Sequence, residues 1–229
     1  MKGMQGNQTA GQEARGDDFY PTPYAALPPL LVAEKKKLPR SIWEPACGNG
    51  ALVIPLRNRG FQVYASDLND WGCPQSQPGV DMLGSVAAQT GVSLRMLHGD
   101  KMGIVTNPPF NIIEEFIERA TAMAPYVAIL CRLSFLESEG RMGWFQRMGL
   151  RRIHVIAERL PMIHRHGYTG KKISNSGICF AWMIYEHKPT VARAVPLRWV
   201  SWKKSCRLHP EQDGDAPPAP KEQLGLFAP

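Results

Sequence analysis

The sequence predicts an α/β domain, in which helices cover both faces of a mostly parallel sheet. A short apolar run is followed by the glycine-containing loop 44–50 and by a helical pattern over 51–58. A second apolar run is followed by Asn-Pro-Pro-Phe at 107–110 and by apolar residues at helical spacing over 111–123. Each loop therefore follows the carboxyl end of a strand, which is where open α/β sheets bind their ligands.

The rest of the chain continues this alternation of strands and helices. We expect a second strand over 61–66, and a first helix over 24–36 that Pro28 and Pro29 must distort or divide. Further along the chain we expect buried strands over 126–133, 152–158 and 178–185, and a helix over 137–148. The stretch between 69 and 99 is rich in Gly, Pro and Gln at its start and predicts a loop there.

Length and composition limit the possible classes of protein. With 229 residues and 44% hydrophobic residues, the chain is long enough for one α/β domain and short for two. The five cysteines are scattered without a C-x-x-C pair, so we expect neither a disulfide framework nor a zinc site. The polar N-terminus and the absence of a long apolar run predict a cytoplasmic protein without a membrane span. The net charge of +7 fits a nucleic-acid-binding protein, although many other proteins are basic.

Composition also divides the chain into three parts. Residues 1–17 carry Gly, Gln and Asn without apolar periodicity and are expected to be a disordered arm. Residues 18–208 form the predicted α/β domain. Residues 209–229 are dominated by Pro, Ala, Gln and acidic residues and are expected to be a flexible tail.

Two nucleotide-binding features accompany the first loop. A dinucleotide fingerprint would need a third glycine where this chain has Val53, so the loop departs from that pattern. Asp67 follows the second strand, where a carboxylate can accept hydrogen bonds from ribose hydroxyls.

Together, the loop 44–50 and the Asn-Pro-Pro-Phe corner resemble the cofactor and catalytic loops of amino-methyltransferases that use S-adenosyl-L-methionine (SAM). The chain from Phe19 to about Glu186 most resembles the compact adenine-N6 DNA methyltransferases of phages and prophages. This resemblance implies a Rossmann-like class I methyltransferase fold with a mostly parallel, seven-stranded sheet. It also implies that the strand over 178–185 is antiparallel and lies at the edge.

The resemblance implies roles for the residues around the cofactor. Glu44 would face the cationic amino acid end of SAM, and Asp81 would contact its adenine amino group. Asp100, which follows the apolar stretch 94–97, is a competing candidate for the adenine contact. The full set of expected cofactor-binding residues is Phe19, Thr22, Glu44, Ala46, Gly48, Gly50, Asp67 and Asp81.

The corner at 107–110 carries the expected chemistry. An exocyclic base amine is a poor nucleophile, and the Asn107 side-chain carbonyl and the Pro108 backbone carbonyl could accept its two hydrogens and free its lone pair. Pro108 and Pro109 fix the backbone, and Phe110 could stack on a base that has been flipped out of the duplex. The attack on the methyl group needs alignment and no metal. The expected catalytic residues are Asn107, Pro108, Pro109 and Phe110.

A basic loop at 161–177 is the expected contact with double-stranded DNA. It interleaves cations, amides and one aromatic residue, a mixture suited to phosphates and base edges, although an isolated basic loop is more often simply solvated. Its expected nucleic-acid-binding residues are His164, Arg165, Lys171 and Lys172. The basic stretch 198–207, which contains two tryptophans, could extend this surface.

Other substrates fit the same motif. Asn-Pro-Pro followed by an aromatic residue also occurs in enzymes that methylate ribosomal RNA bases or protein glutamine. The protein-glutamine enzymes usually carry a helical N-terminal domain, for which this chain has no room. No large target-recognition domain accompanies the predicted catalytic domain, so DNA specificity must come from small loops or be loose. A catalytically inactive DNA-binding module would leave the intact Asn107 unexplained.

The tail ends in a short apolar peptide. Residues 223–227, Gln-Leu-Gly-Leu-Phe, resemble the peptide by which bacterial DNA enzymes dock on the replication sliding clamp. The alternative is that these apolar residues pack back onto the domain. Docking would tether the enzyme to newly made DNA in a bacterial host cell. The expected contacts with the clamp are Gln223, Leu224, Leu226 and Phe227.

Overall fold

The structure is a computed structural model that describes residues 21–161, 177–186 and 194–209. No helix in these ranges is both long enough and apolar enough to cross a membrane. Several residues predicted to take part in binding lie outside the described residues and stay predictions: Phe19, His164, Arg165, Lys171, Lys172, Gln223, Leu224, Leu226 and Phe227.

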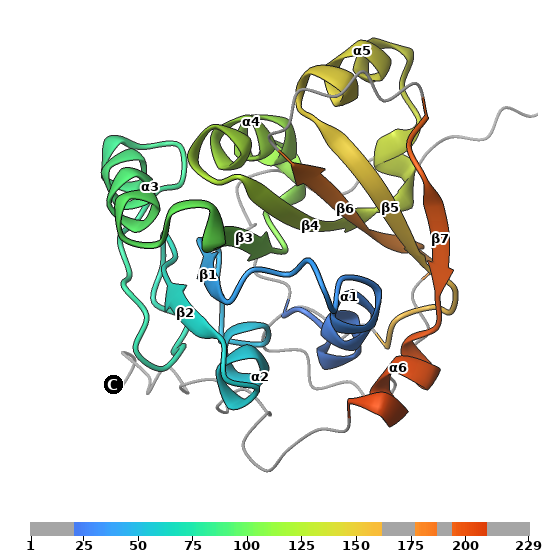
Figure 1. Cartoon of the computed structure of the whole chain (residues 1–229), viewed down its shortest axis with the longest axis horizontal. Coiled ribbons are helices and arrows are strands. Elements are labelled where there is room, and N and C mark those ends of the chain that lie inside the picture. The colour runs from blue at the N-terminus through green and yellow to red at the C-terminus, as the bar shows by residue number, and fades with distance from the viewer. Residues whose placement is uncertain (1–20, 162–176, 187–193, 210–229) are drawn as a thin grey trace, which may run out of the picture.

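One seven-stranded sheet organises the described chain, with the strand order β2-β1-β3-β4-β6-β5-β7 (Figure 1). Every neighbouring pair is parallel except β4–β6 and β6–β5, so β6 alone runs against the other strands. The predicted fold class, a mostly parallel seven-stranded sheet with helices on both faces, is confirmed. The strands are β1 (Ser41–Glu44), β2 (Gln62–Ala65), β3 (Met102–Thr106), β4 (Tyr126–Arg132), β5 (Leu150–Ile156), β6 (Phe180–Glu186) and β7 (Leu197–Val200).

The antiparallel strand does not lie where the resemblance placed it. β6 is hydrogen-bonded to β4 on one side and to β5 on the other, so its expected position at the edge is wrong. Six of its seven residues are buried, as suits a strand covered on both faces and paired along both edges. β7 forms this edge of the sheet instead, and its Arg198 and Trp199 are exposed. The sequence predicted a basic surface stretch here but no strand.

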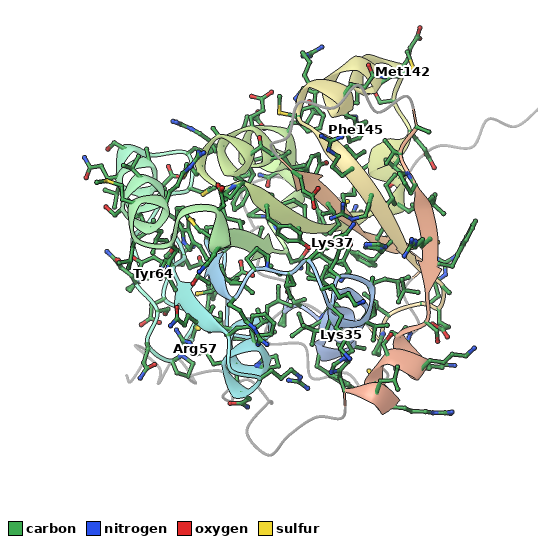
Figure 2. All side chains as sticks on the ribbon, in the orientation of Figure 1. Lys35, Lys37, Arg57, Tyr64, Met142 and Phe145 are labelled. Carbon is green, nitrogen blue, oxygen red and sulfur yellow. The ribbon has the colours of Figure 1, made fainter. Side chains whose placement is uncertain are left out.

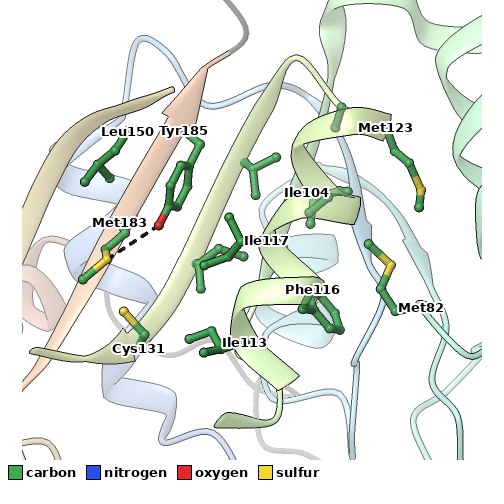
Figure 3. Close-up of a cluster of buried hydrophobic side chains, with 14 of the residues drawn as sticks. Met82, Ile104, Ile113, Phe116, Ile117, Met123, Cys131, Leu150, Met183 and Tyr185 are labelled. Atoms are coloured by element: carbon green, nitrogen blue, oxygen red, sulfur yellow. Dashed lines mark hydrogen bonds between the residues drawn. The ribbon is translucent and has the colours of Figure 1, made fainter. Parts of the chain in front are cut away.

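Helices cover both faces of the sheet and define two apolar layers (Figure 1). Side chains from α1, α2 and α6 pack in one layer, and those from α3, α4 and α5 pack in the other. In the second layer, Phe116 and Ile117 of α4 lie against Ile104 of β3 (Figure 3). The helices are α1 (Leu27–Ala33), α2 (Val53–Asn58), α3 (Ser85–His98), α4 (Ile113–Met123), α5 (Glu139–Arg147) and α6 (Trp202–Leu208).

Helix α3 was not expected from the sequence, which predicted no helix between 69 and 99. Only Ala87 and Gly91 of α3 are buried, so the helix shows almost no apolar periodicity. A Cβ at Gly91 would lie 2.6 Å from Met123 Sδ of α4. Glycine at this position therefore lets the two helices approach closely, and the contact is invisible in the apolar pattern.

The predicted division of the first helix is confirmed. A 3₁₀ turn, η2 (Tyr24–Ala26), precedes α1. Pro28 and Pro29 lie in the first turn of α1. Proline is tolerated there because the first amides of a helix have no intrahelical acceptor.

A buried charge network closes the amino edge of the sheet. Glu34, at the end of α1, is 1% exposed. It accepts hydrogen bonds from Arg152 Nε at 2.9 Å, Arg152 Nη2 at 2.8 Å and His154 Nε2 at 2.7 Å, while Arg152 also binds Glu186 at 2.6 Å. Burial raises the pKa of Glu34, but the hydrogen bonds from His154 and Arg152 outweigh it and lower the pKa to about 2. The network ties α1 to β5 and β6.

Candidate active site

The carboxyl ends of β1, β2 and β3 lie side by side in the sheet and bring the two predicted loops together. Glu44 is the last residue of β1, Asp67 follows β2, and Asn107 follows β3. Because these strands are parallel, all three side chains start from the same edge of the sheet. The sequence-predicted cofactor and catalytic loops therefore form one site.

Unpaired buried oxygen atoms mark this site. Among the described residues, four buried side-chain polar atoms have no hydrogen-bond partner within the protein, and three of them are Glu44 Oε2, Thr106 Oγ1 and Asn107 Oδ1. These three atoms belong to the neighbouring ends of β1 and β3. Unpaired buried polar groups are uncommon and destabilising, so a cluster of them indicates a place where a ligand supplies the missing donors.

Asn107 is held so that its carbonyl oxygen is the unpaired end. Its Nδ2 donates a 3.1 Å hydrogen bond to Thr22 Oγ1, which comes from the chain just before η2. Pro108 is buried and Pro109 adopts φ −56° and ψ 131°, so the backbone beyond the amide is fixed. The amide can therefore accept a hydrogen bond without first rotating.

The glycine loop is shaped by two left-handed residues, Gly48 with φ 53° and Gly50 with φ 90°. A Cβ at Gly50 would lie 3.1 Å from Cys73 Sγ and 3.2 Å from Ile54 Cδ1. Glycine is needed at this position both for its backbone conformation and for the close approach of its neighbours. The Gly48 amide donates to Asp67 Oδ2 at 2.9 Å, which fastens the loop to the end of β2.

Asp67 has a second role that the sequence did not reveal. Besides accepting from Gly48, it accepts from the Asn69 amide at 3.0 Å, so the carboxylate organises both loops around it. Burial raises its pKa, although these backbone hydrogen bonds lower it. The Trp71 side chain and the Leu68 amide also donate to this carboxylate and lower its pKa, so most of its lone-pair sites are engaged within the protein.

Glu44 is a fully buried carboxyl whose ionisation is disfavoured at the site. Its Oε1 accepts from the Ala46 amide at 3.1 Å, while Oε2 is unpaired. Burial raises the pKa of Glu44 well above its usual value; the Thr106 hydroxyl, which is near the carboxyl but outside hydrogen-bonding geometry, and the Ala46 amide offset this only in part, and Asp67 adds to it. A cationic ligand group beside Oε2 would stabilise the ionised carboxylate.

Phe110 lies between the apolar layers and a cation. Its ring centroid is 6.4 Å from that of Phe180, and the guanidinium carbon of Arg132 lies 4.5 Å from the Phe110 centroid. Arg132 is the exposed last residue of β4. The aromatic residue of the corner is therefore supported by packing and capped by a positive charge.

The structure separates the two candidates for the adenine contact. The Val80 amide donates to the Asp67 carbonyl at 3.0 Å, so Asp81 lies beside the site, where its exposed carboxylate accepts from the Leu83 amide. Asp100 precedes β3, whereas Asn107 follows it. Asp100 therefore lies at the opposite edge of the sheet.

Two residues of the site were missed at the sequence level. Thr106 is a fully buried polar residue at the end of an otherwise apolar strand. A polar residue at the end of an apolar run was visible in the sequence and could have indicated its place in the site. Arg132 is likewise the last residue of its strand, β4. Its contact with Phe110 could not be predicted, because no local sequence pattern connects the two residues.

Comparisons with known proteins were made by sequence and by structure. No protein-family model matches the chain, and no curated protein matches it significantly. Among solved structures, a modification subunit of a putative type I restriction enzyme from Vibrio vulnificus matches with 14% identity and a TM-score of 0.47, over 83% of this chain and 48% of that one. This chain thus spans about half the length of that subunit.

Two further matches have similar values. A putative RNA methyltransferase from Pyrococcus horikoshii matches with 14% identity and a TM-score of 0.44, over 72% of this chain and 86% of that one. A magnesium protoporphyrin IX methyltransferase from Synechocystis, solved with bound SAM, matches with 15% identity and a TM-score of 0.43, over 72% and 78%. At such identities the function has to be argued from the site itself.

Proposed function

We propose that this chain is a SAM-dependent methyltransferase that acts on the N6 amino group of adenine in DNA. The observation that carries the proposal is the Asn107 side chain, whose amide nitrogen is bound to Thr22 and whose buried carbonyl oxygen has no partner among the described residues. A site built to hold an acceptor in this way fits a substrate that brings an N–H donor. An exocyclic base amine is such a donor.

The chemistry asked of the protein is to make a delocalised amine nucleophilic. Asn107 Oδ1 would accept one amine hydrogen and the backbone carbonyl of Pro108 the other, so the nitrogen lone pair turns out of the ring plane. SAM supplies a methyl group on a positively charged sulfur. The bound cofactor would supply this methyl group to the amine nitrogen, with the carbon–sulfur electron pair leaving on sulfur; Asn107 and Pro108 would hold the amine in line, and its proton would pass to water.

The residues at the ends of β1 and β2 fit such a cofactor. The unpaired Glu44 Oε2 suits the ammonium group of the amino acid end, and the Asp67 carboxylate suits the ribose hydroxyls, which would take the place of one of its present donors. Gly48 and Gly50 keep side-chain atoms away from the loop surface. Asp81, beside Asp67, is within the same region and suits the adenine amino group.

Nucleic acid as the substrate is supported by charge and by topology. The net charge is +7. Pro161 and Gly177, which bound the predicted basic loop, follow β5 and precede the antiparallel β6, so both lie on the carboxyl edge that carries Asn107. Ribosomal RNA offers the same amine chemistry and is the second candidate substrate.

The test is a methyl-transfer assay with labelled SAM on unmethylated duplex DNA and, in parallel, on ribosomal RNA. Mapping of the labelled nucleotides should locate N6-methyladenine in the DNA. Asn107→Ala should lose at least about a hundredfold in kcat, as is typical when a hydrogen bond made in the transition state is removed. If only the RNA is labelled, RNA and not DNA is the substrate. Full activity of Asn107→Ala would overturn the mechanism.

A further inference from the structure

Charge is divided along the carboxyl edge of the sheet. The ends of β1 and β2 carry Glu44 and Asp67, with Asp81 beside them. On the other half of the edge, β4 ends in Arg132 and β7 carries Arg198. Asn107 lies between the two halves, after the central strand β3. A polyanion that reaches Asn107 is therefore attracted to the β4–β7 half and finds no cation at the ends of β1 and β2, which suit a cationic cofactor.

The unit made of β7 and the start of α6 concentrates this positive charge. Residues 194–209 contain no Asp or Glu, and their four lysines and arginines are all exposed. Trp199, next to Arg198 on β7, is 73% exposed, which is unusual for a large aromatic residue. Lys203 Nζ lies 5.9 Å from the ring centroid of Trp202.

This unit is fixed to the domain. The Ala157 amide donates to the Val200 carbonyl at 3.0 Å, and the Trp202 amide donates to Glu158 Oε2 at 3.0 Å. Ser201 Oγ donates to the other oxygen of Glu158. Glu158, the acid beside the start of α6, thus holds the unit in place, and its single negative charge offsets only one of the four cations.

We propose that β7 and the start of α6 form a second contact surface for duplex DNA, which would hold the backbone at a distance from the flipped base. Arg198, Lys203 and Lys204 would contact phosphates, and the Trp199 ring would pack on deoxyribose. This inference rests on the proposed function.

The spacing suits a duplex lying along the sheet edge. β7 is four strands away from β3, which is about 19 Å at a strand spacing of about 4.8 Å. With a rise of about 3.4 Å per base pair, the contact falls about six base pairs from the target.

A second copy of this chain would be a poorer occupant of the same surface. Pairing of two β7 edges about a twofold axis would bring the Arg198 side chains of both copies close together, and such like charges disfavour edge-to-edge pairing. The same charges are complementary to phosphates.

The experiment compares four variants of the full chain with the wild type in DNA binding, measured by fluorescence anisotropy at several salt concentrations. Lys203→Ala/Lys204→Ala should reduce the salt slope of log Kd by about two, since each phosphate contact contributes about 0.9. Trp199→Ala should weaken binding about fivefold through lost apolar contact, and Trp199→Phe should recover most of that loss. The matched control is Lys36→Ala/Lys37→Ala, which removes two exposed adjacent lysines at the amino edge of the sheet. Lys37 is labelled in Figure 2. This control should leave the salt slope nearly unchanged.

SAM affinity and methyl transfer at saturating DNA are measured for the same proteins. The second surface is overturned, and the proposed function stands, if Lys203→Ala/Lys204→Ala and Trp199→Ala both bind DNA as tightly as the wild type and methylate it at the wild-type rate. An altered salt slope without any transfer to DNA would support the surface and overturn the function. Loss of self-association in Trp199→Ala without change in DNA affinity would assign the surface to a second copy and overturn the proposal.

Discussion

Thr22 and Asn107 are 85 residues apart in the sequence, and Thr22 Oγ1 accepts a 3.1 Å hydrogen bond from Asn107 Nδ2. The sequence had assigned Thr22 to the cofactor. Its hydroxyl holds the Asn107 amide, and the carbonyl oxygen of that amide has no partner among the described residues. Asn107 and the segment before the first helix are thus joined directly.

We expect Thr22→Val to lower kcat about tenfold or more while SAM affinity changes little. The valine side chain fills the same space but cannot accept the Asn107 hydrogen bond, so the amide is free to rotate and alignment is lost. Thr22→Ser keeps the acceptor and is the matched control, with kcat close to that of the wild type. Turnover assays and calorimetric titration of SAM separate the two effects; a drop in SAM affinity alone would return Thr22 to the cofactor.

We expect Asp67→Ala to weaken SAM binding by about tenfold or more, because it removes a ligand acceptor and releases the Gly48 loop. Asp81→Ala should have a smaller effect of the same sign. Asp100→Ala is the control, since Asp100 lies at the amino edge, and its SAM affinity should equal that of the wild type. Calorimetric titration measures all three. Weakening by Asp100→Ala that matches Asp81→Ala would contradict the placement of the adenine contact.

SAM binding should release a proton, because burial raises the pKa of Glu44 well above its usual value. The carboxyl is protonated in the free protein below this raised pKa and ionises when a cationic group arrives, so SAM affinity should rise with pH up to that pKa. Titrations in buffers of different ionisation enthalpy count the proton. Glu44→Gln should release none and bind SAM more weakly.

The same substitution should stabilise the free protein. A carboxyl whose folded pKa lies above its unfolded value contributes stability below the unfolded pKa and loses it as pH rises through the folded pKa. The Tm of Glu44→Gln should therefore exceed that of the wild type at neutral pH, by about 2–4 °C per kcal/mol, and the gap should close in acid. An equal Tm at all pH values would show that Glu44 is not desolvated.

Arg152→Met should destabilise the fold by about 3–5 kcal/mol at neutral pH, because it leaves the buried Glu34 carboxylate without its main partner. The pKa of Glu34 is lowered to about 2, below its unfolded value. Its contribution to stability is therefore present above the unfolded pKa and is lost as pH falls towards 2. Urea unfolding at neutral and acid pH should show the difference shrinking in acid. A constant difference would assign the effect to packing alone.

The tail peptide 212–229 should bind a bacterial sliding clamp in fluorescence-anisotropy titrations. Leu226 and Phe227 would fill an apolar pocket, and the preceding prolines would act as a spacer. Leu226→Ala/Phe227→Ala is the control and should not bind. Equal binding by both peptides, or none at high micromolar clamp, would contradict the prediction.

Much of the fold could be predicted because its strands and loops carry local patterns. The two strand–loop–helix units and α4 follow from apolar spacing, and the site follows from motifs at strand ends. Helix α3 escaped because its buried face consists of two small residues, Ala87 and Gly91, which leave no apolar pattern. The interior position of β6 escaped because strand order depends on contacts between distant residues, such as Leu130 with Trp182, which no local pattern encodes.

The network around Glu34 has a consequence for how the chain folds during synthesis. Glu34 is made early, but its partners Arg152 and His154 follow 118 and 120 residues later. Helix α1 cannot dock with its carboxylate compensated until β5 has left the ribosome. Because Thr22 lies just before this helix, we expect the hydrogen bond between Thr22 and Asn107 to form only once β5 is available to the docking helix.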